Sequence, residues 1–306
     1  MTETLVVEEI EIPPEGGGPG SGPYGITTGP DGALWFTLVH AGVIGRLELP
    51  ARKFSFHPLG APDSGPTVIT PGSDGGLWFC RTHDHRIGRI GTDGRTRQFA
   101  LPGRESGPYG ITAGPDGALW FTETAANRIG RITVTGEVTG FPLPTEGAFP
   151  SAVTAGTDGA LWFTLNQADA VARITTAGEI TSFPLPTEGA APVGVAADAR
   201  SGAVWFAEIG AGAVGRMTAS GEITEFPLPD AASRPHAVAV DGAGACWVTE
   251  WGTGRIARLT PDGTLTEAAL PTPSSEPHGL TPGPDGAIWT ALESGSLARV
   301  TVSDQQ

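Results

Sequence analysis

Apolar, strand-like segments recur along the whole chain at a nearly constant spacing. Each contains one tryptophan, and successive tryptophans are 42 or 43 residues apart: Trp35, Trp78, Trp120, Trp162, Trp205, Trp247 and Trp289. Turn sequences rich in glycine, proline and aspartate separate the segments, and no helical period appears between them. A repeat of this length built from strands is typical of a β-propeller with one blade per repeat. We therefore predict an all-β fold, a seven-bladed β-propeller that forms a single domain over residues 1–306.

The third repeat shows how four antiparallel strands make one blade. Residues 109–112 alternate in polarity, residues 114–117 form a turn, and residues 118–122 are a continuous apolar run. Third and fourth strands are predicted at residues 128–133 and 137–144. A strand that is apolar on both faces needs a neighbour on each side, so we place the seven tryptophans in the core between blades.

An arginine recurs in the third strand of each repeat. The seven positions are Arg46, Arg89, Arg131, Arg173, Arg216, Arg258 and Arg299. Because the same residue stands at the same place in every unit, we predict one repeated ion pair or backbone contact per blade.

The two ends of the chain complement each other. The last repeat stops after its third strand, whereas residues 5–13 have the pattern of a fourth strand. We predict that this N-terminal strand closes the last blade, so that no strand edge is left open between the first and last blades. A closed ring without an exposed edge also predicts a monomer.

The composition and net charge of the chain indicate which classes of partner it is not expected to bind. The chain has 46 glycines and 28 prolines at repeating turn positions, and a net charge of −15 with only 18 basic residues. This acidity disfavours nucleic acid as a partner. No long apolar run and no basic, apolar leader are present, which predicts a cytoplasmic protein that does not enter a membrane. The two cysteines, Cys80 and Cys246, are too few for a disulfide framework and are predicted to be buried thiols.

The repeats differ where the first strand of each blade begins, which is expected to face the channel mouth. The residue after the first proline there is Tyr24, Thr67, Tyr109, Ser151, Val193, His236 or His278 in blades one to seven. The residue before it is Gly22, Gly65, Gly107, Phe149, Ala191, Arg234 or Glu276. Histidine and charge therefore coincide in blades six and seven only, and we predict the functional site there.

Blade seven also contributes two acidic residues, Glu276 and Glu293, near the predicted site. Glu276 and His278 are two residues apart, so on an extended strand both side chains would project to the same side. Glu293 follows Trp289 by four residues, at the end of the strand that pairs with this one. Two carboxylates that leave room for water suit Mg²⁺, although no tight ligand motif is present.

Other residues carry weaker signals. His83 and His85 flank Asp84 in a loop of blade two and are metal-ligand candidates, although an exposed polar loop explains them better. We expect no role for His40 or His57. Trp251 is out of register with the other tryptophans and follows the second strand of blade six, where it is a candidate aromatic wall for a substrate.

The chain resembles the virginiamycin B lyase family, also called streptogramin lyases, over essentially its full length. The segments that carry the resemblance are Gly-Pro-Tyr-Gly-Ile-Thr at 22–27, Arg-Pro-His-Ala at 234–237, Thr-Glu-Trp-Gly at 249–252, Glu-Pro-His-Gly at 276–279, and the spacing of Glu293. The chain departs from the family pattern in the third strand of blade six, where residues 255–258 read Arg-Ile-Ala-Arg and alanine stands in place of the glycine of the usual Ile-Gly pair.

The resemblance implies a seven-bladed propeller that uses Mg²⁺ to open the ring of type B streptogramins, which are cyclic depsipeptides, by elimination. It implies His278 as the general base, Glu276 and Glu293 as Mg²⁺ ligands, and His236 as a substrate-binding group. We also expect Tyr24 and Tyr109 to offer contact surface for a large depsipeptide ring that is rich in aromatic groups. Two rival hypotheses are a metal-dependent propeller lactonase or esterase and a non-catalytic ligand-binding propeller.

Overall fold

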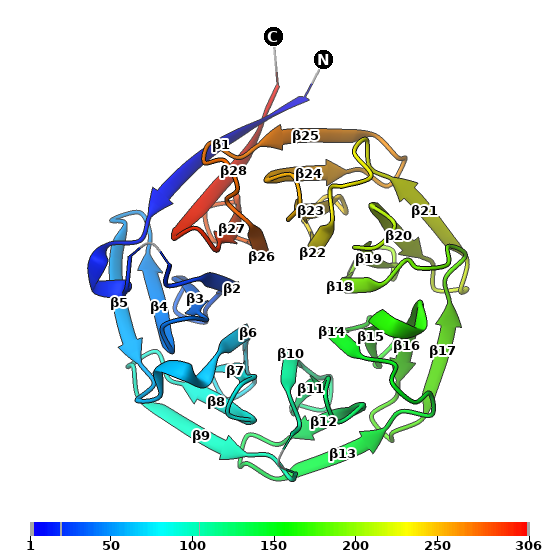
Figure 1. Cartoon of the computed structure of the whole chain (residues 1–306), viewed down its shortest axis with the longest axis horizontal. Helices are drawn as coiled ribbons and strands as arrows, with labels where there is room; N and C mark the ends of the chain where they lie inside the picture. Colours follow the sequence, from blue (N-terminus) through cyan, green and yellow to red (C-terminus); the bar gives the residue numbers. More distant parts are fainter. Residues whose placement is uncertain (1–2, 19, 104, 305–306) are drawn as a thin grey trace.

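Seven four-stranded antiparallel sheets surround a central channel in the computed structural model, which describes residues 3–18, 20–103 and 105–304 (Figure 1). The chain runs round the ring in sequence order, and within each blade it passes from the channel outward. The predicted seven-bladed all-β propeller is confirmed. The three helices of the described residues are single 3-10 turns, η1 (Pro14–Gly16), η2 (Pro62–Ser64) and η3 (Asn166–Ala168). None of them has the length and apolar character that a bilayer crossing requires.

The strands of successive blades occupy equivalent positions. The innermost strands are β2 (Pro23–Thr28), β6 (Pro66–Pro71), β10 (Pro108–Ala113), β14 (Pro150–Ala155), β18 (Pro192–Ala197), β22 (Pro235–Val240) and β26 (Pro277–Pro282). The second strands are β3 (Leu34–Leu38), β7 (Leu77–Arg81), β11 (Leu119–Glu123), β15 (Leu161–Leu165), β19 (Val204–Glu208), β23 (Cys246–Glu250) and β27 (Ile288–Leu292).

The outer half of each blade is equally regular. The third strands are β4 (Val43–Glu48), β8 (Arg86–Ile90), β12 (Arg128–Ile132), β16 (Ala170–Ile174), β20 (Ala213–Met217), β24 (Arg255–Leu259) and β28 (Ser296–Asp304). The outermost strands are β5 (Lys53–Pro58), β9 (Thr96–Ala100), β13 (Val138–Pro142), β17 (Ile180–Pro184), β21 (Ile223–Pro227), β25 (Leu265–Ala269) and, for blade seven, β1 (Glu3–Glu11).

The N-terminal strand closes the ring as predicted. β1 pairs with β28 along nine residues, from Glu3 opposite Asp304 to Glu11 opposite Ser296. Side chains of β1 also reach the neighbouring blades: Arg52 of blade one forms a bidentate pair with Glu8 at 2.7 and 2.8 Å, and Arg258 of blade six lies 2.6 Å from Glu3. The closing strand therefore connects three blades.

The tryptophans and arginines of the repeat share one aspartate in most blades. In blade one, Asp31 accepts a hydrogen bond from the Trp35 indole at 3.0 Å and forms an ion pair with Arg46 at 2.8 Å. Blades two, three, four and seven repeat this arrangement, and in blade six Arg258 lies 3.6 Å from Asp241. The seven tryptophans are buried, as predicted. The predicted ion pair is also confirmed outside blade five, where Trp205 Nε1 and Arg216 Nε have no hydrogen-bond partner among the described residues.

The two cysteines are buried free thiols, as predicted. Cys80 lies on β7 and Cys246 on β23, and both side chains are hidden from solvent.

Candidate functional site

The rim of the channel is built from a conformation that all seven blades share. The residue before the first proline of each inner strand has a positive φ, from 46° to 67°. Glycine adopts this conformation without cost in blades one to three, whereas Phe149, Ala191, Arg234 and Glu276 adopt it in blades four to seven. β26 begins only at Pro277, so the expectation that Glu276 and His278 lie on one extended strand is wrong. Glu276 instead lies in a left-handed turn, and its carbonyl accepts the Glu293 N–H at 3.1 Å.

His278 is a buried side chain held from several sides. The Thr249 hydroxyl of blade six donates to the His278 carbonyl at 2.9 Å, which ties its backbone to the neighbouring blade. The Tyr24 ring stacks on the imidazole with 4.2 Å between centroids, and the His236 ring meets it edge-on at 4.7 Å. The Nε2 atom contacts Glu293 Oε2, and Nδ1 is buried without a partner among the described residues.

Glu293 links two histidines from different blades. His278 Nε2 contacts one carboxylate oxygen, and His40 Nε2 of blade one lies 2.7 Å from the other. The contact with His278 lowers the pKa of Glu293 to about 2 in spite of partial burial, and the contact with His40 acts in the same direction. Glu293 is therefore an ionised acceptor at neutral pH.

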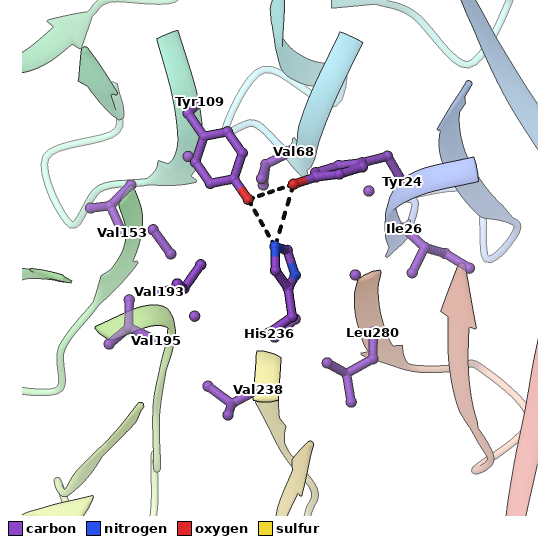
Figure 2. Close-up of a pocket in the computed structure, with 16 residues that line it drawn as sticks. Tyr24, Ile26, Val68, Tyr109, Val153, Val193, Val195, His236, Val238 and Leu280 are labelled. Carbon is purple, nitrogen blue, oxygen red and sulfur yellow. Dashed lines mark hydrogen bonds between the residues drawn. The ribbon is translucent and has the colours of Figure 1, made fainter. Parts of the chain in front are cut away.

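Three polar side chains from distant blades meet in the channel (Figure 2). The Tyr24 and Tyr109 hydroxyls are 2.6 Å apart, and His236 Nε2 lies 3.5 Å from the first and 3.4 Å from the second. Burial raises the pKa of Tyr24 well above its usual value and that of Tyr109 to about 12. Burial, and then the proximity of His278, lowers the pKa of His236 to about 3. All three groups are thus neutral at physiological pH and connected by neutral hydrogen bonds.

An apolar cavity of about 140 Å³ extends along the channel beside this cluster. Its apolar wall includes Ile26, Val68, Val153, Val195, Val238 and Leu280. Ile26, Val238 and Leu280 lie two residues further along their inner strands than Tyr24, His236 and His278. The tyrosine and histidine cluster therefore separates the rim from the aliphatic part of the channel.

Comparison with known proteins places this arrangement in a family. The model of the virginiamycin B lyase family matches residues 6–300. The chain belongs to the virginiamycin B lyase family.

Solved structures of family members superimpose closely on the chain. Virginiamycin B lyase from Staphylococcus aureus is 41% identical with a TM-score of 0.91, and the match covers 97% of this chain and 99% of that one. A catalytically inactive histidine-to-alanine variant of that lyase, solved with quinupristin, is 39% identical with a TM-score of 0.92, covering 97% of this chain and 99% of that one.

A match among curated proteins is strong but local. Virginiamycin B lyase from Saccharopolyspora erythraea is 55% identical over 58 residues, which span 19% of this chain and 18% of the relative.

The two predicted metal ligands, Glu276 and Glu293, differ in their contacts. Glu293 has both oxygens engaged by histidines, whereas the half-buried Glu276 side chain makes no hydrogen bond or ion pair with another described residue. Within residues 3–18, 20–103 and 105–304, no group of three or more histidine, cysteine, aspartate or glutamate side chains is arranged to hold a metal ion. Both predicted ligands carry carboxylate oxygens, which are the donors that Mg²⁺ prefers.

The other candidates lie apart from the cluster. Trp251 is at the rim of blade six, where the Arg234 guanidinium lies 5.6 Å from the indole centroid. The Trp251 backbone N–H donates to the Arg234 carbonyl at 3.2 Å. In blade two, Asp84 pairs with Arg81, and His85 Nδ1 accepts the Gly107 N–H at 3.2 Å. These contacts give His85 and Asp84 a structural role, and His83 is exposed.

Two rim residues were missed by sequence reasoning. His40, for which no role was expected, contacts Glu293. Phe149 is a 43% exposed aromatic side chain in the left-handed conformation, and its carbonyl accepts the Asn166 N–H at 3.1 Å, just as Glu276 accepts that of Glu293. Phe149 therefore occupies in blade four the place that Glu276 has in blade seven.

Proposed function

We propose that this protein is a carbon–oxygen lyase that linearises type B streptogramins by elimination at their ester bond. The observation that carries the proposal is the contact of a buried histidine, His278, with an ionised carboxylate, Glu293, at the channel rim. Membership of the virginiamycin B lyase family supports the substrate class, and a family member solved with quinupristin is inactivated by a histidine-to-alanine change.

The reaction requires a base and no water. In the target ring the ester oxygen is attached to the β-carbon of an amino-acid residue, next to the α-carbon that carries the proton to be removed. When the α-proton is removed, the electron pair of the C–H bond forms a Cα=Cβ double bond, the Cβ–O bond breaks, and the carboxylate departs. The product is a linear isomer of the substrate that contains a dehydroamino acid.

His278 is the proposed base because an imidazole has a lone pair available near neutral pH. Its Nε2 faces Glu293 and its Nδ1 is buried, so neither nitrogen is open to solvent in this arrangement. Proton removal therefore requires the substrate to take the place of one of these contacts. The stacked Tyr24 ring and the Thr249 hydrogen bond keep the imidazole at the rim while that exchange occurs.

Glu276 and Glu293 are the proposed Mg²⁺ ligands. Both carboxylates come from blade seven, and their backbones are joined by the hydrogen bond between Glu293 N–H and the Glu276 carbonyl. When bound, Mg²⁺ would act as a Lewis acid that stabilises negative charge on carbonyl oxygens of the substrate.

Neutral polar and aromatic groups form the proposed substrate surface. His236 stays uncharged because its pKa is about 3, so it would bind an amide or ester by hydrogen bonding rather than by charge. Tyr24 and Tyr109 lie beside it, and Trp251 and the exposed Phe149 stand on the rim of blades six and four. We propose that these aromatic rings contact the aromatic side chains of the depsipeptide.

One assay separates this proposal from its rivals. The purified protein is incubated with Mg²⁺ and quinupristin, and the product is analysed by mass spectrometry. Elimination gives unchanged mass with new conjugated absorbance, ester hydrolysis by a lactonase adds one water, and a binding protein leaves the ring closed. His278→Ala should abolish turnover with the fold retained, whereas a control variant, His83→Ala in the exposed loop of blade two, should keep full rate. Full activity of His278→Ala would refute the assignment of the base.

A further inference from the structure

Glu293 is held by two imidazoles, one on each carboxylate oxygen. His278 belongs to the same blade, but His40 lies in the loop after β3 of blade one. The His40 Nε2 atom is 2.7 Å from Glu293 Oε1, and 52% of the His40 side chain is exposed. The contact joins residues that are 253 positions apart in the chain, and it crosses the junction between the first and last blades.

Local structure in blade one directs His40 toward this junction. The His40 N–H donates to the Ser21 carbonyl at 3.1 Å, and the Val39 N–H donates to the Gly22 carbonyl at 2.8 Å. Gly22 has a φ of 67°, and a Cβ at this position would lie 2.4 Å from His40 Cδ2. Gly22 therefore adopts this backbone conformation without the strain that a side chain would add, and its lack of a Cβ leaves the space that the His40 ring occupies.

We propose that His40 is a positioning residue for the reaction, acting through Glu293. The inference rests on the proposed function. The Glu293 side chain is 24% exposed, and holding both of its carboxylate oxygens restricts its conformations more than holding one of them. The His40 N–H holds Oε1, and this leaves Oε2 directed at His278. The His40 contact keeps the Glu293 carboxylate in this orientation when the contact between Glu293 and His278 opens for proton removal. Groups that orient a catalytic or ligating carboxylate in this way commonly affect activity or metal affinity by about 10- to 100-fold.

Blade two supplies a matched control for each part of the arrangement. His83 follows Trp78 by five residues, as His40 follows Trp35. Gly65 has a φ of 59°, and a Cβ there would lie 2.6 Å from His83 Nδ1. Substitutions in blade two thus impose a similar backbone strain and a similar ring displacement, but His83 has no hydrogen bond or ion pair with Glu293.

The kinetic test compares five variants with the wild type. His40→Ala is expected to lower kcat by about 10-fold or more and to change KM less than twofold. His40→Gln retains an N–H donor and should recover most of kcat. Gly22→Ala should resemble His40→Ala, whereas Gly65→Ala and His83→Ala should leave kcat unchanged. Thermal unfolding of each variant shows whether the loss arises from destabilisation, because Gly22→Ala and Gly65→Ala carry similar strain.

A second readout does not depend on turnover. Crystal structures of wild type and His40→Ala should show that the Glu293 carboxylate moves away from His278 only in the variant. An unmoved Glu293 together with an unchanged kcat would overturn the proposal and reduce the contact to a surface ion pair of little consequence. If the wild type has no lyase activity, the proposed function fails, and the position of Glu293 in the two structures still decides the role of His40.

Discussion

Glu208 in blade five is a buried carboxylic acid without a partner. It ends β19, it is fully hidden from solvent, and neither carboxylate oxygen has a hydrogen-bond partner among the described residues. In blade three the equivalent Glu123 is also fully buried, but both of its oxygens accept hydrogen bonds from Arg128 at 2.7 Å. Ala213 of blade five pairs with Glu208 in the register that Arg128 has with Glu123. The cation that balances this position in blade three is therefore missing in blade five.

The missing partner has a calculable cost. Burial, and then the nearby charges of Glu225 and Asp169, raise the pKa of Glu208 from 4.5 to about 8. Because the folded protein holds this proton more tightly than the unfolded chain, stability is greatest below pH 4.5 and falls as the pH rises toward 8. At about 1.4 kcal/mol per pKa unit, the loss is under about 1 kcal/mol at pH 5 and about 3 kcal/mol at pH 7.

Glu208→Gln removes the ionisation and should stabilise the fold in a pH-dependent way. Urea unfolding at pH 5 and pH 7 should show a gain in unfolding free energy that is about 2 kcal/mol larger at pH 7. Glu123→Gln, the matched substitution in blade three, should destabilise at both pH values because it breaks a buried ion pair. Ala213→Arg should also stabilise at pH 7 by restoring the partner. An equal effect of Glu208→Gln at both pH values would show that Glu208 is ionised in the fold and would refute the reasoning.

Two further predictions concern the channel and its rim. Tyr109→Phe removes the hydroxyl that lies 2.6 Å from Tyr24 and 3.4 Å from His236, so urea unfolding should show a loss of about 1–2 kcal/mol; a loss near zero would mean that these bonds do not form. Phe149→Gly should raise KM for quinupristin by roughly tenfold, the loss of about 1.4 kcal/mol of aromatic contact, while the unfolding free energy stays equal or rises because glycine relieves the left-handed conformation. Ala191→Gly, at the equivalent position of blade five with a φ of 47°, should change stability alike without changing KM, and a KM rise in both variants would contradict a direct contact by Phe149.

The repeat made most of the fold predictable from the sequence. Each tryptophan strand, its hairpin partner and the recurring arginine obey short-range rules, and seven copies make the pattern unambiguous. The exchange of the last outer strand for the N-terminal one could be predicted for the same reason, because a missing unit stands out against six complete ones. The candidate site residues Tyr24, His236 and His278 were predicted as departures from that repeat, and the structure brings their side chains together.

What the repeat could not supply was the conformation and neighbourhood of single residues. The left-handed turn at Glu276 was signalled only by the glycines that fill the same position in blades one to three, and the presence of an acidic residue there suggested an ordinary strand. His40 and His83 have the same place in their repeats, yet only His40 meets Glu293. That difference depends on which blade stands next in the closed ring, and not on local sequence.

The pairing of β1 with β28 has a consequence for the order in which the protein matures. During synthesis β1 leaves the ribosome almost three hundred residues before its partner β28. At usual elongation rates, β1 stays unpaired for roughly 15 to 60 seconds. Until the partner arrives, neighbouring blades can form but the junction between the first and seventh cannot. His278, Glu276 and Glu293 belong to that seventh blade, and Tyr24 and His40 belong to the first. The arrangement around Glu293 should consequently form late, because the contacts of His40 with Glu293 and of Tyr24 with His278 cross that junction.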